Sequence, residues 1–153
     1  MHSKLISIWI LIIIIFASCE SKVEKTIEGS WSIDTLYYHE YDIRNCVLIN
    51  VIDFEQFFCE LPTTESYCEG LVEYVREGQW EVEKTDSIPL VLKIKTENAI
   101  FSGTHRVIFK KDEQNRLLKM ELRSDNLYVV CRKGLFNYDK NEDLVDDLVK
   151  MSH

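Results

Sequence analysis

Cysteine is the residue type in this 153-residue chain that could take part in the most kinds of chemistry, and the chain contains five cysteines. Four of them lie beyond the N-terminal segment, namely Cys46, Cys59, Cys68 and Cys131. An even number in an exported chain favours disulfides, and four cysteines allow three pairings. The spacings contain no C-x-x-C, so zinc and haem signatures are absent. We therefore expect two disulfides, or one disulfide and a free pair, with a metal or redox role as the lesser alternative.

Two specific cysteine pairings are open at this point. Cys59 and Cys68 flank one polar loop, Thr63 to Gly70, and could staple it. Cys131 could instead pair with a residue near position 59, which would tie the last strand to an early one. Closing so long a loop stabilises a chain by about 3–5 kcal/mol in the chain-entropy treatment.

Catalytic motifs are missing from the sequence. It contains no G-x-S-x-G, H-E-x-x-H, Walker A or G-x-G-x-x-G pattern. The histidines beyond the N-terminus are His39, His105 and His153, which are too few and too scattered for a metal shell. We expect no enzymatic activity, no metal and no cofactor.

Aromatic residues are the better lead to a function. If the chain encloses a cavity, inward aromatic rings with a few tyrosine hydroxyls would suit a small hydrophobic ligand. The alternative is that side chains simply fill the interior, as they do in small barrels. The candidate ligand-lining residues are Tyr37, Tyr74, Trp80 and Phe109.

The N-terminus carries an export signal. Lys4 precedes an apolar run from Leu5 to Phe16, which ends in Ala17-Ser18-Cys19. A run of this length is too short to span a bilayer, which takes about 20 helical residues. Phe16 to Cys19 resembles the lipobox of bacterial lipoproteins. That resemblance implies removal of residues 1–18 and acylation of Cys19; the alternative is an ordinary cleaved signal that leaves Cys19 as a free thiol.

Charge restricts the partners of the mature chain. Removing the signal would leave 135 of the 153 residues, enough for one domain, and would lose only Lys4 among the charged groups. The formal charge then passes from −8 to −9. Such a surface repels phosphate backbones and anionic headgroups, which argues against nucleic-acid binding. Membrane attachment must come from acyl chains, and residues 19–28 are expected to form a polar tether between lipid and domain.

The rest of the chain has the pattern of short strands. From Gly29 to Arg132, apolar and polar residues alternate in segments separated by turn residues, which predicts eight to ten strands in an all-β antiparallel meander. A meander this long closes into a barrel or folds into a sandwich. The less regular segments expected as strands are 47–54, 71–76 paired with 79–84 through Glu77-Gly78, and 100–101.

The C-terminal segment, residues 133–153, differs from the strands. Between Asp139 and Met151, Leu144, Leu148 and Met151 recur at helical spacing, with acidic residues on the other side. This predicts an amphipathic helix that docks on the outside of the barrel. An unpacked acidic tail is the alternative.

Gly29-Ser30-Trp31, at the start of the first strand, resembles the entry motif of lipocalins. The mature chain is similar to small lipocalin-like lipoproteins of Bacteroidetes-type bacteria, in three further stretches: Cys59–Pro62, Gly78–Trp80 and Leu117–Leu122. The resemblance implies a barrel of about eight strands over residues 29–132, in which Trp31 lies at the closed end and a cation from the last strand, Arg132, packs over its indole.

Two functions from different classes follow from this expected cellular location and fold. The first is a lipid-anchored protein of the cell envelope, at the outer membrane, that binds or carries a small apolar molecule. The second is an envelope protein–protein interaction module, such as a scaffold, inhibitor or immunity-type lipoprotein, with a filled barrel. A carrier needs a cavity of roughly 300–1,000 Å³. An interaction module instead needs a packed interior and an exposed apolar patch.

Overall fold

The computed structural model describes residues 22–64, 68, 70–83, 89–135, 146–147 and 149–150. Its elements, in chain order, are α2 (Lys22–Ile27), β1 (Gly29–Tyr38), β2 (Tyr41–Asp42), the 3₁₀ helix η1 (Arg44–Cys46), β3 (Val51–Glu55), β4 (Phe58–Glu60), β5 (Glu77–Glu83), β6 (Val91–Lys95), β7 (Gly103–Asp112), β8 (Leu117–Arg123) and β9 (Leu127–Gly134). The predicted signal sequence and Cys19 lie outside the described residues.

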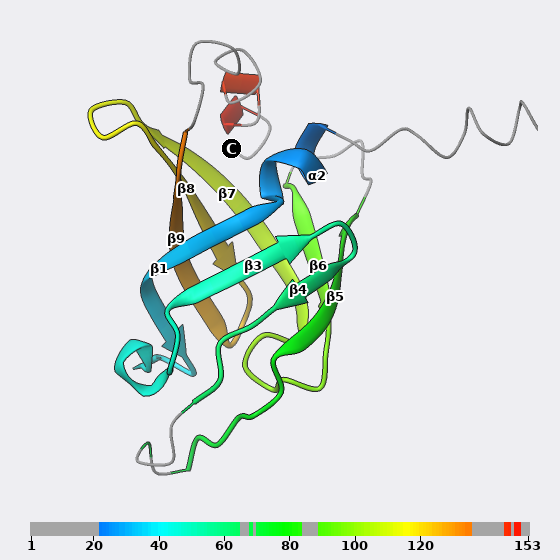
Figure 1. The fold of residues 1–153 in the computed structure, drawn as a ribbon, viewed down its shortest axis with the longest axis vertical. Helices are drawn as coiled ribbons and strands as arrows, with labels where there is room; N and C mark the ends of the chain where they lie inside the picture. The colour runs from blue at the N-terminus through cyan, green and yellow to red at the C-terminus, as the bar shows by residue number, and fades with distance from the viewer. Residues whose placement is uncertain are drawn as a thin grey trace, which may run out of the picture.

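The strands form one antiparallel sheet that closes on itself (Figure 1). Its order is β2-β1-β3-β4-β5-β6-β7-β8-β9, and β1 also pairs with β9. Strand β1 can serve both neighbours because its first residues, Gly29–Ser32, pair with β3, whereas residues from Ser32 to Tyr38 pair with β9. The prediction of an all-β barrel of about eight strands is confirmed, with the two-residue β2 as an addition.

Period-two alternation places one face of each strand inside the barrel. In β9, Leu127, Val129 and Cys131 are buried while the residues between them are more exposed. The same alternation of buried and more exposed residues recurs around the sheet. It produces a single core, whose largest fully buried side chains are Trp31, Phe54, Phe101 and Phe109. The inward positions of the described strands are therefore occupied by large apolar groups.

Four predicted strands differ from the observed elements. Glu77 and Gly78 are not a hairpin turn; they belong to β5, which pairs with β4 and β6. Residues 71–76 form no strand, although Leu61 N donates to Arg76 O and Thr64 N donates to Glu73 O. Residues 100–101 lie in a turn, and strand β3 begins only at Val51. The apolar residues of these segments are partly buried, such as Val47 and Phe101, and partly exposed, such as Leu48 and Val72, so their composition resembled that of a strand.

Part of the segment expected to be a tether, residues 19–28, is folded. Residues 22–27 form α2, whose last two residues, Thr26 and Ile27, are buried against the barrel. At the other terminus, residues 146–147 and 149–150 are helical, and Lys111 Nζ lies 3.1 Å from Asp146 Oδ1. The remainder of the expected helix over 139–151 lies outside the described residues. The helical C-terminal residues and α2 lie at the same end of the barrel (Figure 1).

Candidate functional site

The closed end of the barrel is built around Trp31. Its side chain is fully buried, its Nε1 donates to the carbonyl of Ile27 at 2.6 Å, and its ring lies 6.3 Å from that of Phe109. Gly29, at φ +104°, lets the chain turn from α2 into β1, a conformation that L side chains rarely adopt. Helix α2 thereby lies over the inward indole and closes this end.

The cation on Trp31 is Lys133, which corrects the expectation for Arg132. Lys133 Nζ lies 4.5 Å from the Trp31 ring centroid and donates to the carbonyls of Thr26 and Glu28, the latter at 2.8 Å. Burial lowers the pKa of Lys133 to about 8. Arg132 points out of the barrel, where its Nε lies 3.2 Å from Asp34 Oδ1. Of the residues expected at the closed end, Gly29, Trp31 and Arg132, the Trp31 side chain therefore points into the barrel and that of Arg132 points out of it.

The cysteines form one disulfide and a free pair. Cys46 and Cys68 are bonded, whereas Cys59 and Cys131 are free and buried. Neither the expected staple between Cys59 and Cys68 nor a bond from Cys131 to the region of Cys59 is formed. Burial raises the pKa of Cys59 to about 12, and burial also raises that of Cys131. Both thiols are therefore held in the unreactive protonated form.

The four candidate ligand-lining aromatics do not share one cavity. Phe109 and Trp80 are buried in the core, where Trp80 lies edge-on to Phe54 at 5.4 Å. Tyr37 contacts Tyr128 at 6.4 Å and is partly exposed. Tyr74 is 70% exposed. The two inward rings serve as packing, and the two tyrosines lie on the surface.

Opposite α2, the second end of the barrel is closed by loops that Asn98 holds together. Asn98 is fully buried; its Nδ2 donates to Val75 O at 2.7 Å and to Pro62 O at 3.2 Å. Its Oδ1 accepts from the backbone amides of Ile100 and Phe101. One side chain thereby joins the segments 61–64, 71–76 and 96–102.

Glu73 is a second buried polar residue at this end. Its Oε1 accepts from Val75 N at 2.9 Å, and its Oε2 accepts from Ala99 N at 2.6 Å. Thr64 completes the connection, because its hydroxyl donates to Leu71 O and accepts from Glu73 N. Buried polar groups with satisfied hydrogen bonds fix a local structure, so these loops are held rigidly over the core.

Exposed apolar side chains on the segments at this end of the barrel form what we call the apolar rim: Tyr41 on β2, Leu48 and Ile49 after η1, and Val72 and Tyr74 in segment 71–76. The segments that carry them are neighbours, because Leu48 N donates to Thr63 O and Thr64 N donates to Glu73 O. Tyr41, on β2, is the most exposed of the five at 75%. The sequence signal for the rim was the run of apolar residues in segments 47–50 and 71–76. The pattern of these residues predicts strands, so the sequence alone does not indicate an exposed surface.

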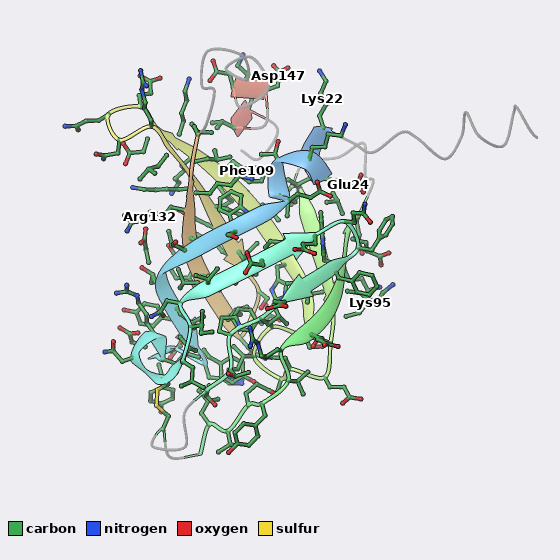
Figure 2. The ribbon with its side chains drawn as sticks, in the orientation of Figure 1. Lys22, Glu24, Lys95, Phe109, Arg132 and Asp147 are labelled. Atoms are coloured by element: carbon green, nitrogen blue, oxygen red, sulfur yellow. A yellow bond between two sulfur atoms is a disulfide. The ribbon has the colours of Figure 1, made fainter. Side chains whose placement is uncertain are left out.

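A hollow of about 520 Å³ opens beside the rim, next to the disulfide. Tyr38, His39 and Tyr41 supply its aromatic wall, and Ile43 and Leu71 supply aliphatic surface. The His39 ring lies edge-on to Tyr38 at 4.3 Å. The Cys46–Cys68 bond, visible at the end of the barrel away from Lys22, connects η1 to the loop that borders this hollow (Figure 2).

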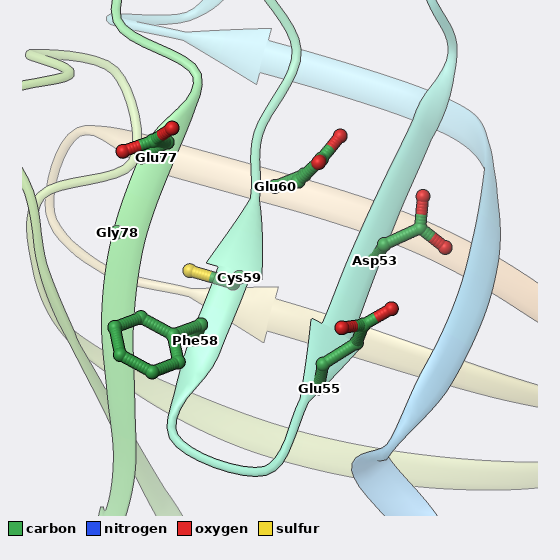
Figure 3. Close-up of a pocket in the computed structure, with 7 residues that line it drawn as sticks. All are labelled: Asp53, Glu55, Phe58, Cys59, Glu60, Glu77 and Gly78. Atoms are coloured by element: carbon green, nitrogen blue, oxygen red, sulfur yellow. The ribbon is translucent and has the colours of Figure 1, made fainter.

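A different hollow, of about 540 Å³, lies on the outer surface of β3, β4 and β5 (Figure 3). Four carboxylates border it: Asp53, Glu55, Glu60 and Glu77. Glu60 is paired with Arg76 at 2.9 Å, and Asp53 accepts from the Ser30 hydroxyl. Within the described part of the chain, no three His, Cys, Asp or Glu residues are grouped so that they could hold a metal ion.

Comparison with known proteins gives no relative: no family model matches the chain, and no curated protein or solved structure is significantly similar to it. Among the residues that the structure describes, no helix has the length and apolar character needed to cross a membrane.

Proposed function

We propose that this chain is a lipid-anchored interaction module of the cell envelope, whose filled barrel presents the apolar rim to a protein partner. The observation that carries the proposal is the gathering of five exposed apolar side chains on neighbouring loops at one end of the barrel. Single exposed apolar residues are ordinary, but a group of them on one surface is typical of interaction sites.

The rim has two properties that favour tight association. Tyrosine is enriched among the residues that dominate binding energy, and the rim holds two exposed tyrosines, Tyr41 and Tyr74. The buried hydrogen bonds of Asn98 and Glu73 hold the loops in place before a partner arrives. Less conformational entropy is then lost on binding. The hollow beside Tyr41 offers a place for an apolar anchor side chain of the partner.

The filled interior favours this function over the carriage of an apolar ligand within the barrel. Inward positions hold Trp31, Phe54, Trp80 and Phe109, all buried in one core. The two hollows described above open on the outer surface of β3–β5 and at the loop-covered end. An apolar ligand inside the barrel stays a prediction, which native mass spectrometry of the purified protein can test.

The proposed anchor lies at the end of the barrel opposite the rim. Cys19 precedes α2 by three positions, and a chain of three residues spans about 10 Å at most. Helix α2 lies at the end of the barrel opposite the disulfide (Figure 2). An acylated Cys19 would therefore hold the α2 end next to the membrane, with the rim at the far end of the barrel.

A photo-crosslinking experiment tests the proposal in intact cells. Benzoylphenylalanine replaces Tyr74 in the full chain, and we expect a discrete adduct with one protein. The adduct should disappear when Leu48→Ser and Val72→Ser are added, while the melting temperature stays unchanged because both side chains are exposed. The matched control places the same probe at Arg106, which is exposed on β7. Equal labelling from both positions, or no adduct from Tyr74, would contradict the proposal.

A further inference from the structure

Two adjacent phenylalanines are exposed at the end of the barrel opposite the rim. Phe57 is 71% exposed and Phe58 is 61% exposed, at the turn between β3 and β4. This turn lies beside α2, because Gln56 N donates to Glu28 Oε1 at 3.1 Å and a surface hollow is bordered by Glu24 together with both phenylalanines. The β3–β4 turn therefore lies at the end of the barrel where α2 begins (Figure 1), and the Phe58 ring lies over the outer face of β5 (Figure 3).

The turn holds these rings in a fixed position. Trp80 N donates to Phe57 O at 3.0 Å, and Phe58 pairs with Gln79 of β5. Gln56 has φ +43°, which is an uncommon conformation for a residue with a side chain. Neither ring takes part in the core, although Phe54 and Trp80 lie in it nearby. The chain thus exposes two large apolar groups to water on a turn whose backbone is held by hydrogen bonds.

We propose that Phe57 and Phe58 insert into the interface of the lipid bilayer that carries the anchor. The inference rests on the proposed acylation of Cys19, which would keep α2 within about 10 Å of the lipid surface. Aromatic and apolar side chains bind at the boundary between headgroups and acyl chains, at a depth of about 5–10 Å. The partner is thus a lipid surface, and the contact area is the β3–β4 turn beside α2.

The charges around the turn allow this approach. Lys22 and Lys25 are exposed on α2, one turn of helix apart. Glu81, which borders the same hollow, is neutralised by Lys95 at 2.9 Å. The acidic surface of β3–β5 with Asp53, Glu60 and Glu77 extends from the turn toward the other end of the barrel. Glu24 and Glu55 lie beside the same turn, so lysines and carboxylates both surround the two rings.

Insertion gives the acyl anchor a second point of contact and so restricts the tilt of the barrel. A single flexible attachment would let the molecule lie on its side, with the rim against the membrane. Contact through both Cys19 and the β3–β4 turn would hold the rim outward. The phenylalanines therefore decide whether the rim is available to a partner.

Fluorescence quenching in vesicles tests the proposal. The acylated mature chain, residues 19–153, is prepared as Phe57→Trp and reconstituted in phosphatidylethanolamine–phosphatidylglycerol vesicles, with and without lipids brominated in the upper part of the acyl chain. The native Trp31 and Trp80 are buried, so the unsubstituted protein supplies the background to subtract. The matched control is Tyr74→Trp, an equally exposed position on the rim.

We expect bromine to quench about half of the added emission in Phe57→Trp and little in Tyr74→Trp, since only the former would lie at a depth of about 5–10 Å. Equal quenching of the two, or none at position 57 while the protein stays on the vesicles, would overturn the proposal. Loss of the whole protein from membranes on Cys19→Ala reports on the anchor alone. An acylated protein that shows no quenching would thus reject the insertion and leave the anchor standing.

Discussion

Lys133 Nζ lies 4.5 Å from the centre of the Trp31 ring and also donates to the carbonyls of Thr26 and Glu28. One ammonium group therefore joins the last strand to the first and to the C-terminal end of α2. Cations are favourable at such helix ends because the last carbonyls lack partners within the helix. The closed end of the barrel depends on this side chain as well as on the indole that it covers.

Replacing Lys133 with Met should destabilise the protein by about 1–3 kcal/mol, because the Thr26 and Glu28 carbonyls lose their charged donor. Arg132→Met is the matched control; its loss removes only a partly exposed ion pair with Asp34 and should cost less than about 1 kcal/mol. Urea denaturation of the two variants measures the difference. A larger effect from Arg132 would contradict the assignment of Lys133 as the structural cation.

The choice between these two neighbours follows from the alternation of burial along the strand. Leu127, Val129 and Cys131 are the buried positions of the last strand, and continuing their alternation places Lys133 inside and Arg132 outside. Residues 127–131 are all apolar, so the sequence alone does not show which of them point inward. The family resemblance pointed to the wrong parity. The alternation of burial is the better guide to which cation covers Trp31, because a shift of one residue turns every side chain to the other face of the sheet.

Breaking the disulfide should affect the end of the barrel that carries the rim. Cys46 and Cys68 are 22 positions apart, and a loop of that length corresponds to about 3 kcal/mol in the chain-entropy treatment. We expect Cys46→Ala with Cys68→Ala to lower the free energy of unfolding by that order, as measured in urea. Addition of a reductant to the unsubstituted protein should have the same effect. An unchanged unfolding midpoint under both treatments would be inconsistent with the bond.

Loops were the part of the fold that periodicity could not predict. The segment 71–76 has the apolar content of a strand, yet its backbone bonds to residues 61–64, and its side chains divide between the core and the rim. The buried Asn98 and Glu73 that organise this end are polar residues in turns, where most such residues are solvated. Their role depends on contacts across 23 to 36 positions, which local patterns do not contain.

Acid should weaken the loop-covered end through His105, whose Nε2 lies 2.9 Å from Phe101 O and whose Nδ1 is buried without a hydrogen-bond partner. Burial lowers the pKa of His105 in the folded state, an effect that the bond to Phe101 only partly offsets. The unfolded chain therefore takes up a proton first as the pH falls below about 6.5, so stability is present above that pH and is lost below it.

The slope from this one group is at most about 1.4 kcal/mol per pH unit. His105→Phe should flatten the dependence of unfolding free energy on pH between about 6.5 and 5, above the range in which ordinary carboxylates titrate. His39→Gln, at an exposed position, serves as the control. If the slope in this window persists without His105, another group must account for it.

A substitution at Gly78 measures how closely β5 packs on β4 and on the turn that follows β6. A Cβ at this position would lie 3.0 Å from Cys59 Sγ and 3.1 Å from Thr96 Cβ, which is closer than ordinary contacts. Gly78→Ala should therefore cost about 1–3 kcal/mol through overpacking. In the double variant with Cys59→Ala the sulfur is removed, so the combined cost should fall below the sum of the single costs by about 0.5 kcal/mol or more. Full additivity in urea unfolding would show that Thr96, not Cys59, sets the limit on space at this strand.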